Sequence, residues 1–535
     1  MWGSNARETH PIFFQHLLKG LTRGAKLYAV DPRFTSSAQW AELWLGLDVG
    51  TDVALAHAMA REIIAAGLHN REFVERATTG FEAFAAHVEP FTLERAAEIT
   101  GVPGAAIAEV ARAYARAPRA QLCWTLGITE HHNAVDNVLA LINLSLLTGH
   151  VGRWGSGVNP LRGQNNVQGG GDMGALPDRL PGFQHIELPR LREKFEAAWG
   201  TPLRHERGWH LTQMFSAMER GELSALYVIG ENPAQSEADG HRTERLLGGL
   251  DTLIVQDMFF TRTARIADVV LPASAGWCES EGTFTSSERR VQRVRRAKSP
   301  PGEARDDLDI IVDLARVMGH ELIRGVPRPT AEDVWDELRT VSPVHRGMSY
   351  ARLEANHGLH WPCWDLDHPG EPFLHARLWE SPVGGPRAPF STVDHTPPFE
   401  ALEPDWPLRL TTGRRLSEFN TGVMSGVYQV PNRREETLDI SPADADLYGL
   451  VEGERVRVRS RRGAVEVPVH IDPGLRGGLT FMTFHFPDDV ASNLLTIDAV
   501  DPKSGTAEFK AAAIRIERLA KEPSAAPDAS RSAVP

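Results

Sequence analysis

The stretch Leu223-Ser-Ala-Leu-Tyr-Val-Ile-Gly-Glu-Asn232 determines the fold that we expect for this chain. Its apolar run has the composition of a buried strand and leads directly into a glycine turn. A second apolar run, Thr252–Gln256, follows and ends at Asp257. In nucleotide-binding βαβ units, a glycine turn after one strand admits a phosphate, and an acid at the end of the next strand takes a ribose or a base. The stretch therefore predicts a nucleotide-binding unit.

The same pattern occurs at the start of the chain. Gly3-Ser4-Asn5 is followed by the apolar run Lys26–Val30 and by Asp31. The spacing from Asn to Asp is 26 residues in this copy and 25 in the other. After each Asp, five residue types recur at identical spacing, with Thr35, Ala38, Ala41, Glu42 and Leu45 matching Thr261, Ala264, Ala267, Asp268 and Leu271. Two half-Rossmann units in one chain predict two nucleotide-like groups that face each other.

The first copy is shorter than the second at its N-terminal end. Only Met1 and Trp2 precede Gly3, whereas a parallel strand has several residues and is buried on both faces. We therefore expect the first domain to be N-terminally incomplete.

Composition restricts the class of protein. The chain has 535 residues and a formal charge of −13, which argues against a nucleic-acid partner. Its three cysteines, Cys123, Cys278 and Cys363, form no CxxC motif, so neither a disulfide framework nor a zinc or iron–sulfur site is expected from them. No signal peptide and no run of ~20 apolar residues is present, which predicts a cytoplasmic protein without membrane insertion.

Local patterns divide the chain into five parts. Residues 1–164 alternate strand and helix signals and form a first αβα domain, with helices expected over Pro11–Lys19, 53–64, 105–116 and 133–147. Residues 165–275 contain the second unit, and 276–400 are a mixed α/β segment with a linker. Residues 401–519 have a β pattern that includes a hairpin at 461–463, and 520–535 are a polar tail that we expect to be disordered.

One glycine-rich motif concentrates polar side chains between the two units. It runs from Asn159 to Asp178 and contains Arg162-Gly-Gln164-Asn165-Asn166-Val-Gln168. Amides can satisfy a heteroaromatic ring that offers both donors and acceptors, and a guanidinium can bind a carboxylate through two parallel hydrogen bonds. The motif predicts a site for a heteroaromatic group and a small acid, with a self-bonded surface loop as the alternative.

This motif, with Gly127–Asn133 and Thr148–Arg153, resembles the catalytic subunit of molybdenum- or tungsten-dependent formate dehydrogenases, in the molybdopterin oxidoreductase family. Further stretches that fit are 268–272, 281–292, 334–338, 410–414 and 503–510, so the resemblance covers nearly the whole chain except the tail. It implies an α/β fold with two Rossmann-like αβα domains, the first truncated, and a C-terminal double-psi-type β-barrel.

The resemblance also implies a cofactor, a reaction and site residues. Members of the family bind two molybdopterin guanine dinucleotides that chelate the metal, and they oxidise formate to carbon dioxide or catalyse the reverse. Arg162 would orient formate, and Gln164 and Asn165 would touch the pterins. The other cofactor-binding residues implied are Gly3, Ser4, Asn5, His10, Asp31 and Arg33 for one dinucleotide, Gly230, Asn232, Asp257 and Thr261 for the other, and Thr412, Gly413, Arg414, Asn493 and Lys510 from the C-terminal domain.

The chain also departs from the family pattern. The family's four-cysteine segment for a [4Fe–4S] cluster and its catalytic cysteine or selenocysteine would precede Gly3, and neither occurs in this sequence. We therefore assign no metal ligand, expect electron-transfer partner subunits (NAD-linked, hydrogenase-linked or membrane-bound) and a further N-terminal segment, and expect little activity from the isolated chain. A selenocysteine codon taken as a stop, a wrong start or a frameshift would each explain the pattern.

Two other functions stay open at this level. One is another molybdopterin oxidoreductase of the nitrate reductase type, against which Arg162 argues because a carboxylate substrate needs the guanidinium fork. The other is a non-catalytic remnant that binds the cofactor or a partner. His131, His132 and His150 are expected to be capping or packing residues rather than metal ligands.

Overall fold

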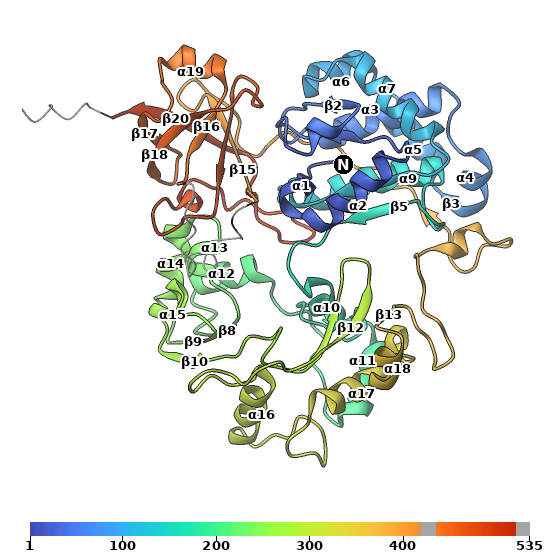
Figure 1. Cartoon of the computed structure of the whole chain (residues 1–535), viewed down its shortest axis with the longest axis vertical. Coiled ribbons are helices and arrows are strands. Elements are labelled where there is room, and N and C mark those ends of the chain that lie inside the picture. Colours follow the sequence, from blue (N-terminus) through green and yellow to red (C-terminus); the bar gives the residue numbers. More distant parts are fainter. Residues whose placement is uncertain (417, 419–434, 520–535) are drawn as a thin grey trace, which may run out of the picture.

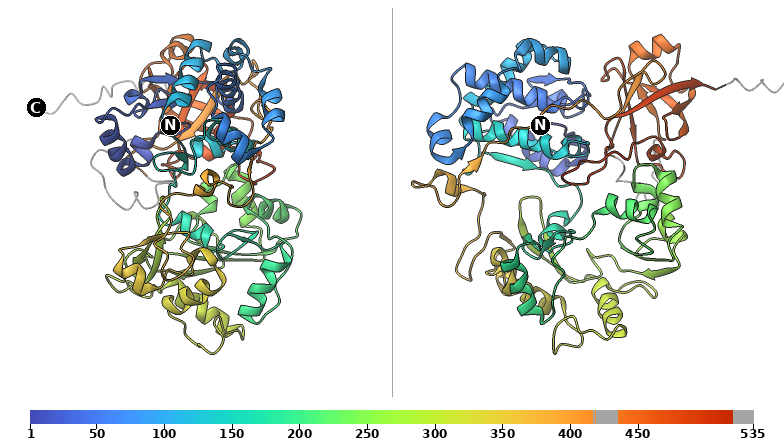
Figure 2. Two further views of the ribbon diagram at one scale, coloured as in Figure 1. Left: turned by 90° about the vertical axis from the view of Figure 1, so that its right-hand side faces the viewer. Right: turned by 180° about the vertical axis from the view of Figure 1, so that it is seen from behind.

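The computed structural model describes residues 1–416, 418 and 435–519. An αβα domain (blue to cyan) and a β-barrel (orange to red) lie side by side in the upper half of Figure 1, and residues from about 165 to 375 lie below them. The view from behind in Figure 2 shows the same arrangement. In this part of the chain, no helix has both the length and the apolar character needed to cross a membrane.

The first domain is built on a parallel sheet. Strands β2 (Leu43–Leu45) and β1 (Tyr28–Val30) pair on one side, and β4 (Gln121–Trp124) and β5 (Gly157–Pro160) pair on the other. Trp2 forms parallel bridges to both Val30 and Trp124, so the start of the chain occupies the middle of the sheet. The sequence predicted this βα alternation, and the structure confirms it.

Helices cover this sheet and bury its apolar side chains. Helices α3 (Asp52–Ala65), α7 (Gly104–Arg116) and α9 (Ala134–Thr148) match three of the four predicted helices, and the fourth, Pro11–Lys19, matches α2 (Pro11–Leu21). Leu55, Ile63, Leu141 and Leu144 are fully buried between α3, α7 and α9. The domain also contains α1 (Ala6–Thr9), η1 (Ala38–Trp40), α4 (Arg71–Ala77), β3 (Thr78–Thr79), α5 (Phe81–Val88), α6 (Leu93–Thr100) and α8 (Leu126–Thr129).

The second unit is a smaller parallel sheet of order β10-β9-β8. Its strands are β8 (Ala225–Ile229), β9 (Thr252–Asp257) and β10 (Val269–Pro272). The apolar run chosen from the sequence is therefore a strand, and Gly230 begins the turn after it. The helices of this unit are α12 (Leu211–Glu219), α13 (Pro233–Ser236), α14 (Gly240–Leu247) and α15 (Arg262–Arg265).

A third body combines two regions that are distant in sequence. Helices α10 (Val167–Asp172) and α11 (Pro189–Trp199) pack against β11 (Gly282–Thr285) and α17 (Ala331–Val341). The predicted boundary at residue 165 stays a prediction, and this packing associates residues 165–200 with the segment 276–400. The remaining elements of this body are β6 (Arg179–Leu180), β7 (Gln184–His185), β12 (Arg290–Val294), η2 (Pro343–His345), α18 (Tyr350–Ala355) and β13 (Leu359–His360). Helix α16 (Asp307–Val317) is joined instead to β9, because Gln256 donates to Asp307. Beyond the third body lie η3 (Ala376–Trp379) and β14 (Ala388–Pro389), which pairs with β3.

The C-terminal region forms the barrel that the resemblance implied. Six strands close in the order β15-β19-β16-β18-β17-β20. Their bounds are β15 (Leu408–Gly413), β16 (Leu438–Ile440), β17 (Arg455–Arg459), β18 (Ala464–Ile471), β19 (Leu479–Thr483) and β20 (Ala512–Arg518), with α19 (Pro442–Tyr448) and η5 (Ser492–Leu494) beside them. Strands β17 and β18 form the predicted hairpin, with Arg459 opposite Ala464. The predicted disordered tail, 520–535, lies outside the described residues.

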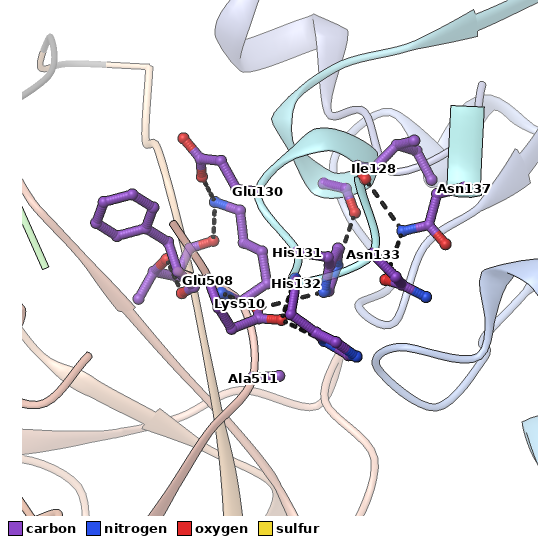
Figure 3. A network of polar contacts seen from close by, with 12 residues as sticks. Ile128, Glu130, His131, His132, Asn133, Asn137, Glu508, Lys510 and Ala511 are labelled. Carbon is purple, nitrogen blue, oxygen red and sulfur yellow. Dashed lines mark hydrogen bonds and ion pairs between the residues drawn. The ribbon is translucent and has the colours of Figure 1, made fainter. Parts of the chain in front are cut away.

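Buried charges join the barrel to the first domain (Figure 3). Glu508, next to β20, is 1% exposed, and its carboxylate lies 3.3 Å from His131 Nδ1 and 3.2 Å from His132 Nδ1. It also accepts hydrogen bonds from the backbone nitrogens of His132 and Lys510, both at 3.0 Å. The expectation that these histidines pack or cap is thus refined, because both bind a carboxylate that lies more than 370 positions away in the sequence.

The hydrogen bonds of His131 determine its charge. Its Nε2 lies 3.1 Å from the Gly127 carbonyl oxygen, which can only accept, so Nε2 carries a proton. Its Nδ1 lies at ion-pair distance from the Glu508 carboxylate, which favours the ring protonated at both nitrogens, a cation. The Glu508 charge raises the pKa of His131 despite burial, and the two histidines hold the pKa of Glu508 well below its usual range. Asp52, whose pKa burial raises, and Lys510 are the other charged groups near His131.

Gly127 lies against the backbone of Gly3, so a substitution at Gly127 tests how tightly the first glycine turn is packed. A Cβ on Gly127 would lie 2.5 Å from the Gly3 carbonyl oxygen. We expect Gly127→Ala to cost about 1–3 kcal/mol because backbone must move. The apparent melting temperature, measured by calorimetry, should fall by several degrees. In the control Gly20→Ala, within α2, the nearest atom to the new Cβ is 3.8 Å away, so no loss is expected. Equal melting temperatures for the two variants would contradict this.

The buried pair predicts how stability changes with pH. The raised pKa of His131 means that its contribution is complete below its unfolded pKa of about 6.5 and is lost as pH rises through the folded value. The lowered pKa of Glu508 means that its contribution is complete above about pH 4.3 and is lost as pH falls. The pair is therefore most stabilising at about pH 5–6.

We expect His131→Gln to flatten the loss of thermal stability between about pH 6.5 and 9 relative to the unsubstituted chain. Glu508→Gln should cost about 3–5 kcal/mol, since it leaves a buried cation without a partner. The melting temperature measured across this pH range checks both. His470→Gln, which removes a partner from an exposed ion pair with Glu452, is the matched control and should leave the slope unchanged. If His131→Gln behaves like this control, the assigned charge of His131 is wrong.

Candidate functional site

The two predicted copies make the same hydrogen bonds. Asn5 Oδ1 accepts from the backbone nitrogen and hydroxyl of Ser37 at 3.2 and 2.8 Å. Asn232 Oδ1 accepts from the same two groups of Thr263, also at 3.2 and 2.8 Å. Each asparagine therefore connects its glycine turn to the residue six positions after the matched Asp. We call this contact the asparagine clamp.

The strand ends match in the same way. Asp31 Oδ1 accepts from Arg33 N at 3.0 Å, and Asp257 Oδ1 accepts from Phe259 N at 2.9 Å. The hydroxyls of Thr35 and Thr261 accept from the amides three residues later at 3.2 and 3.1 Å. Both glycine turns have positive φ, +54° at Gly3 and +64° at Gly230. Burial raises the pKa of both acids, to about 6 for Asp31.

A cleft of about 780 Å³ lies at the second copy. Of the residues predicted to bind the cofactor, the structure brings seven to its wall, namely Gln164, Asn165, Gly230, Asn232, Asp257, Thr261 and Asn493. They come from the glycine-rich motif, the second sheet and the barrel. Glu130 and Glu237 also line it, and sequence reasoning did not select either of them. Burial raises the pKa of Glu237 to about 7, so at neutral pH this carboxyl can donate a hydrogen bond.

The other predicted residues surround the first copy. Arg33 stacks over the Phe481 ring, 3.6 Å from its centroid, and lies beside Gly413 of β15. Lys510 donates to the Thr412 carbonyl oxygen at 3.0 Å and pairs with Glu130 at 2.6 Å. Arg414 Nε donates to the Glu418 carbonyl oxygen at 2.9 Å, and Ser4 is buried with its hydroxyl unpartnered among the described residues.

Arg162 lies between the two copies. Its carbonyl oxygen accepts from His10 Nε2 at 2.6 Å, which links it to the first copy, and Gln164, two residues later, lines the cleft at the second. Its side chain is exposed, and its Nε donates to Gln168 Oε1 at 3.1 Å. Among the described residues, no carboxylate forms an ion pair with it. The guanidinium is therefore available to bind an anion from solution.

Family models match most of the chain. Residues 1–317 match the molybdopterin oxidoreductase model, and 408–513 match the molydopterin dinucleotide binding domain. The second match coincides with the barrel.

Known proteins extend this match. The chain is 40% identical to the F420-dependent formate dehydrogenase 2 subunit alpha of Methanococcus maripaludis, over 97% of this chain and 76% of that protein. It is 33% identical to the assimilatory nitrate reductase catalytic subunit of Bacillus subtilis, over 96% of this chain and 73% of that protein.

Among solved structures, the acetylene hydratase of Pelobacter acetylenicus superposes with a TM-score of 0.72 at 20% identity, covering 95% of this chain and 76% of that one, which shows the fold. The family matches and the relatives confirm the resemblance seen in the sequence. The chain belongs to the molybdopterin oxidoreductase family, whose formate dehydrogenases are among its relatives.

Proposed function

We propose that this chain is the catalytic subunit of a formate dehydrogenase, which oxidises formate to carbon dioxide or catalyses the reverse. The observation that carries the proposal is Arg162, an exposed guanidinium between the two copies that no carboxylate of the described chain pairs with. A guanidinium binds a carboxylate by two parallel hydrogen bonds, and formate is the smallest carboxylate. The identity to a formate dehydrogenase alpha subunit supports the same choice.

The residues present fit a pair of molybdopterin guanine dinucleotides. Each copy supplies a left-handed glycine turn and an acid at a strand end, and one copy opens into a cleft of about 780 Å³. At the other copy, the buried hydroxyl of Ser4 has no partner among the described residues, and a polar ligand could provide one. The residues that would hold the cofactor are those predicted from the sequence, with Glu130 and Glu237 added.

The chemistry divides between the cofactor and the chain. Formate loses one proton and two electrons when it becomes carbon dioxide, and the molybdenum or tungsten of the bound cofactor would supply the acceptor for those electrons. Arg162 would bind both carboxylate oxygens and so direct the C–H bond of formate away from itself. Gln164 and Asn165 would offer amide groups to the pterins.

The route by which electrons would leave the metal is inferred from the family resemblance. We infer a [4Fe–4S] cluster from the family resemblance alone, and partner subunits also because the relative is named as one subunit of an enzyme. Within residues 1–416, 418 and 435–519, no group of three or more His, Cys, Asp or Glu side chains is placed to hold a metal ion.

Two other functions have support. The nitrate reductase relative favours an enzyme that reduces another oxyanion, against which the match of the Arg162 fork to a carboxylate argues. The second alternative is a protein that binds the cofactor without catalysis, for which the two family matches would also account. The alternatives predict different activities of the cofactor-loaded protein: a formate dehydrogenase oxidises formate, a nitrate reductase reduces nitrate, and a non-catalytic protein does neither.

Substitution of Arg162 tests the proposal. In enzyme purified with its native partners from its own locus, we expect Arg162→Gln to lower kcat/KM for formate-dependent dye reduction by about 100-fold, since two charged hydrogen bonds are lost. Molybdenum or tungsten and guanine nucleotide content should stay unchanged. Arg190→Gln, at another exposed arginine, is the matched control and should keep full activity.

Three results would contradict the proposal. Unchanged formate turnover in Arg162→Gln would remove its central residue. Nitrate-dependent oxidation of reduced dye without formate oxidation would identify a nitrate reductase. A fully loaded enzyme that is inactive with both substrates would indicate a non-catalytic remnant.

A further inference from the structure

The Arg162 side chain is hydrogen-bonded to Gln168, which is in turn hydrogen-bonded to Asp172. Arg162 Nε donates to Gln168 Oε1 at 3.1 Å, and Gln168 Nε2 donates to Asp172 Oδ1 at 2.8 Å. Exposure falls along this series, because Arg162 is exposed, Gln168 is intermediate and Asp172 is 3% exposed. An exposed guanidinium is thus connected through one amide to a carboxylate in the protein interior.

Local structure keeps these anchors in place. Gln168 and Asp172 are four residues apart on α10, so their side chains lie on one face of the helix. Asn166, which begins this helix, accepts from Thr285 N of β11 at 2.9 Å. The Asp172 carbonyl oxygen accepts from Gly182 N at 2.7 Å. Bonds to two separate segments therefore hold the helix to the third body.

The charge of Asp172 sets the direction of both hydrogen bonds. Burial raises the pKa of Asp172 to about 6, while the hydrogen bond from Gln168 and the charges of Arg162 and Arg289 oppose the rise. At neutral pH the carboxylate is mostly ionised and can only accept. It therefore orients the Gln168 amide with its NH₂ inward and its oxygen toward Arg162.

We propose that Gln168 and Asp172 are positioning residues that hold Arg162 and select the edge of its guanidinium that meets the substrate carboxylate. Because Gln168 occupies Nε, the side edge formed by Nε and one Nη is blocked, which leaves the end edge formed by Nη1 and Nη2 for a carboxylate. A carboxylate can then bind in one orientation. We call the hydrogen-bonded series from Arg162 through Gln168 to Asp172 the tether. The inference rests on the proposed function for the identity of the substrate, whereas the existence of the tether does not depend on it.

The tether can be measured without substrate. In the full chain labelled with ¹⁵N-arginine, the Nε–H signal of Arg162 is identified by its loss in Arg162→Lys. We expect its hydrogen exchange to be about tenfold faster in Gln168→Ala, because exchange follows the population of the open form. Asp172→Asn should give a smaller increase. Asp178→Asn, which removes a carboxylate that binds Arg179 and Arg207 instead, is the matched control and should cause no change.

Kinetics of the loaded enzyme separate positioning from folding. For Gln168→Ala and Asp172→Asn, we expect KM for formate to rise about tenfold while kcat changes by less than about threefold. Cofactor content should match that of the unsubstituted enzyme. Because Asp172 is buried and its substitution can impair folding, Gln168→Ala, at a half-buried position, keeps the test valid.

A charge exchange provides a rescue. Gln168→Glu alone places a second carboxylate against Asp172, and we expect the same rise in KM. In Gln168→Glu combined with Asp172→Asn, the new amide at position 172 can donate to the new carboxylate at position 168, which still accepts from Arg162. We expect KM to return to within about threefold of the original value, which a purely structural role would not produce.

The outcomes distinguish this inference from the proposed function. Equal Nε–H exchange in the unsubstituted chain and Gln168→Ala would overturn the tether. If the exchange results show the tether but KM for formate is unchanged in both single variants, Gln168 and Asp172 are not positioning residues. If the exchange results hold while the unsubstituted enzyme does not oxidise formate, the proposed function fails and the tether stands.

Discussion

The asparagine clamp is the contact on which the arrangement of both nucleotide-type units depends. Each clamp accepts two hydrogen bonds from one residue, at identical distances in the two copies. Both asparagines are buried, so their amides cannot exchange these bonds for water without cost. The clamp fixes the glycine turn relative to the acid at the next strand end, and these two features together define where a nucleotide can lie.

Local signals were enough to predict the elements of the fold. The runs before Gly230 and Asp257 are strands, and the four helices predicted in the first domain correspond to α2, α3, α7 and α9. The repeat of residue types after each Asp predicted equivalent units, because identical spacing places side chains of the same kind at equivalent positions. Periodicity and turn residues describe such short-range features well.

Contacts between distant segments could not be predicted in this way. Glu508 binds His131 and His132, and Arg33 stacks on Phe481, across hundreds of residues. The association of α10 and α11 with residues 276–400 is likewise a matter of tertiary packing. At the candidate site, spacing alone could have suggested that Gln168 and Asp172 share a helix face. The sequence does not show that Asp172 is buried, and this burial is what makes its carboxylate a fixed anchor for Gln168. The roles of the site residues remain predictions.

The position of Asn493 has a consequence for assembly. From the barrel it donates to the backbone oxygens of Gln235 and Ser236, both at 3.0 Å, while it also lines the cleft. A large molecule seated there touches the second sheet and the barrel at once. Such an occupant would join the two bodies, because each supplies part of its contacts. Loss of one set of contacts would leave it held by the other, so its release would be slower than either set alone predicts.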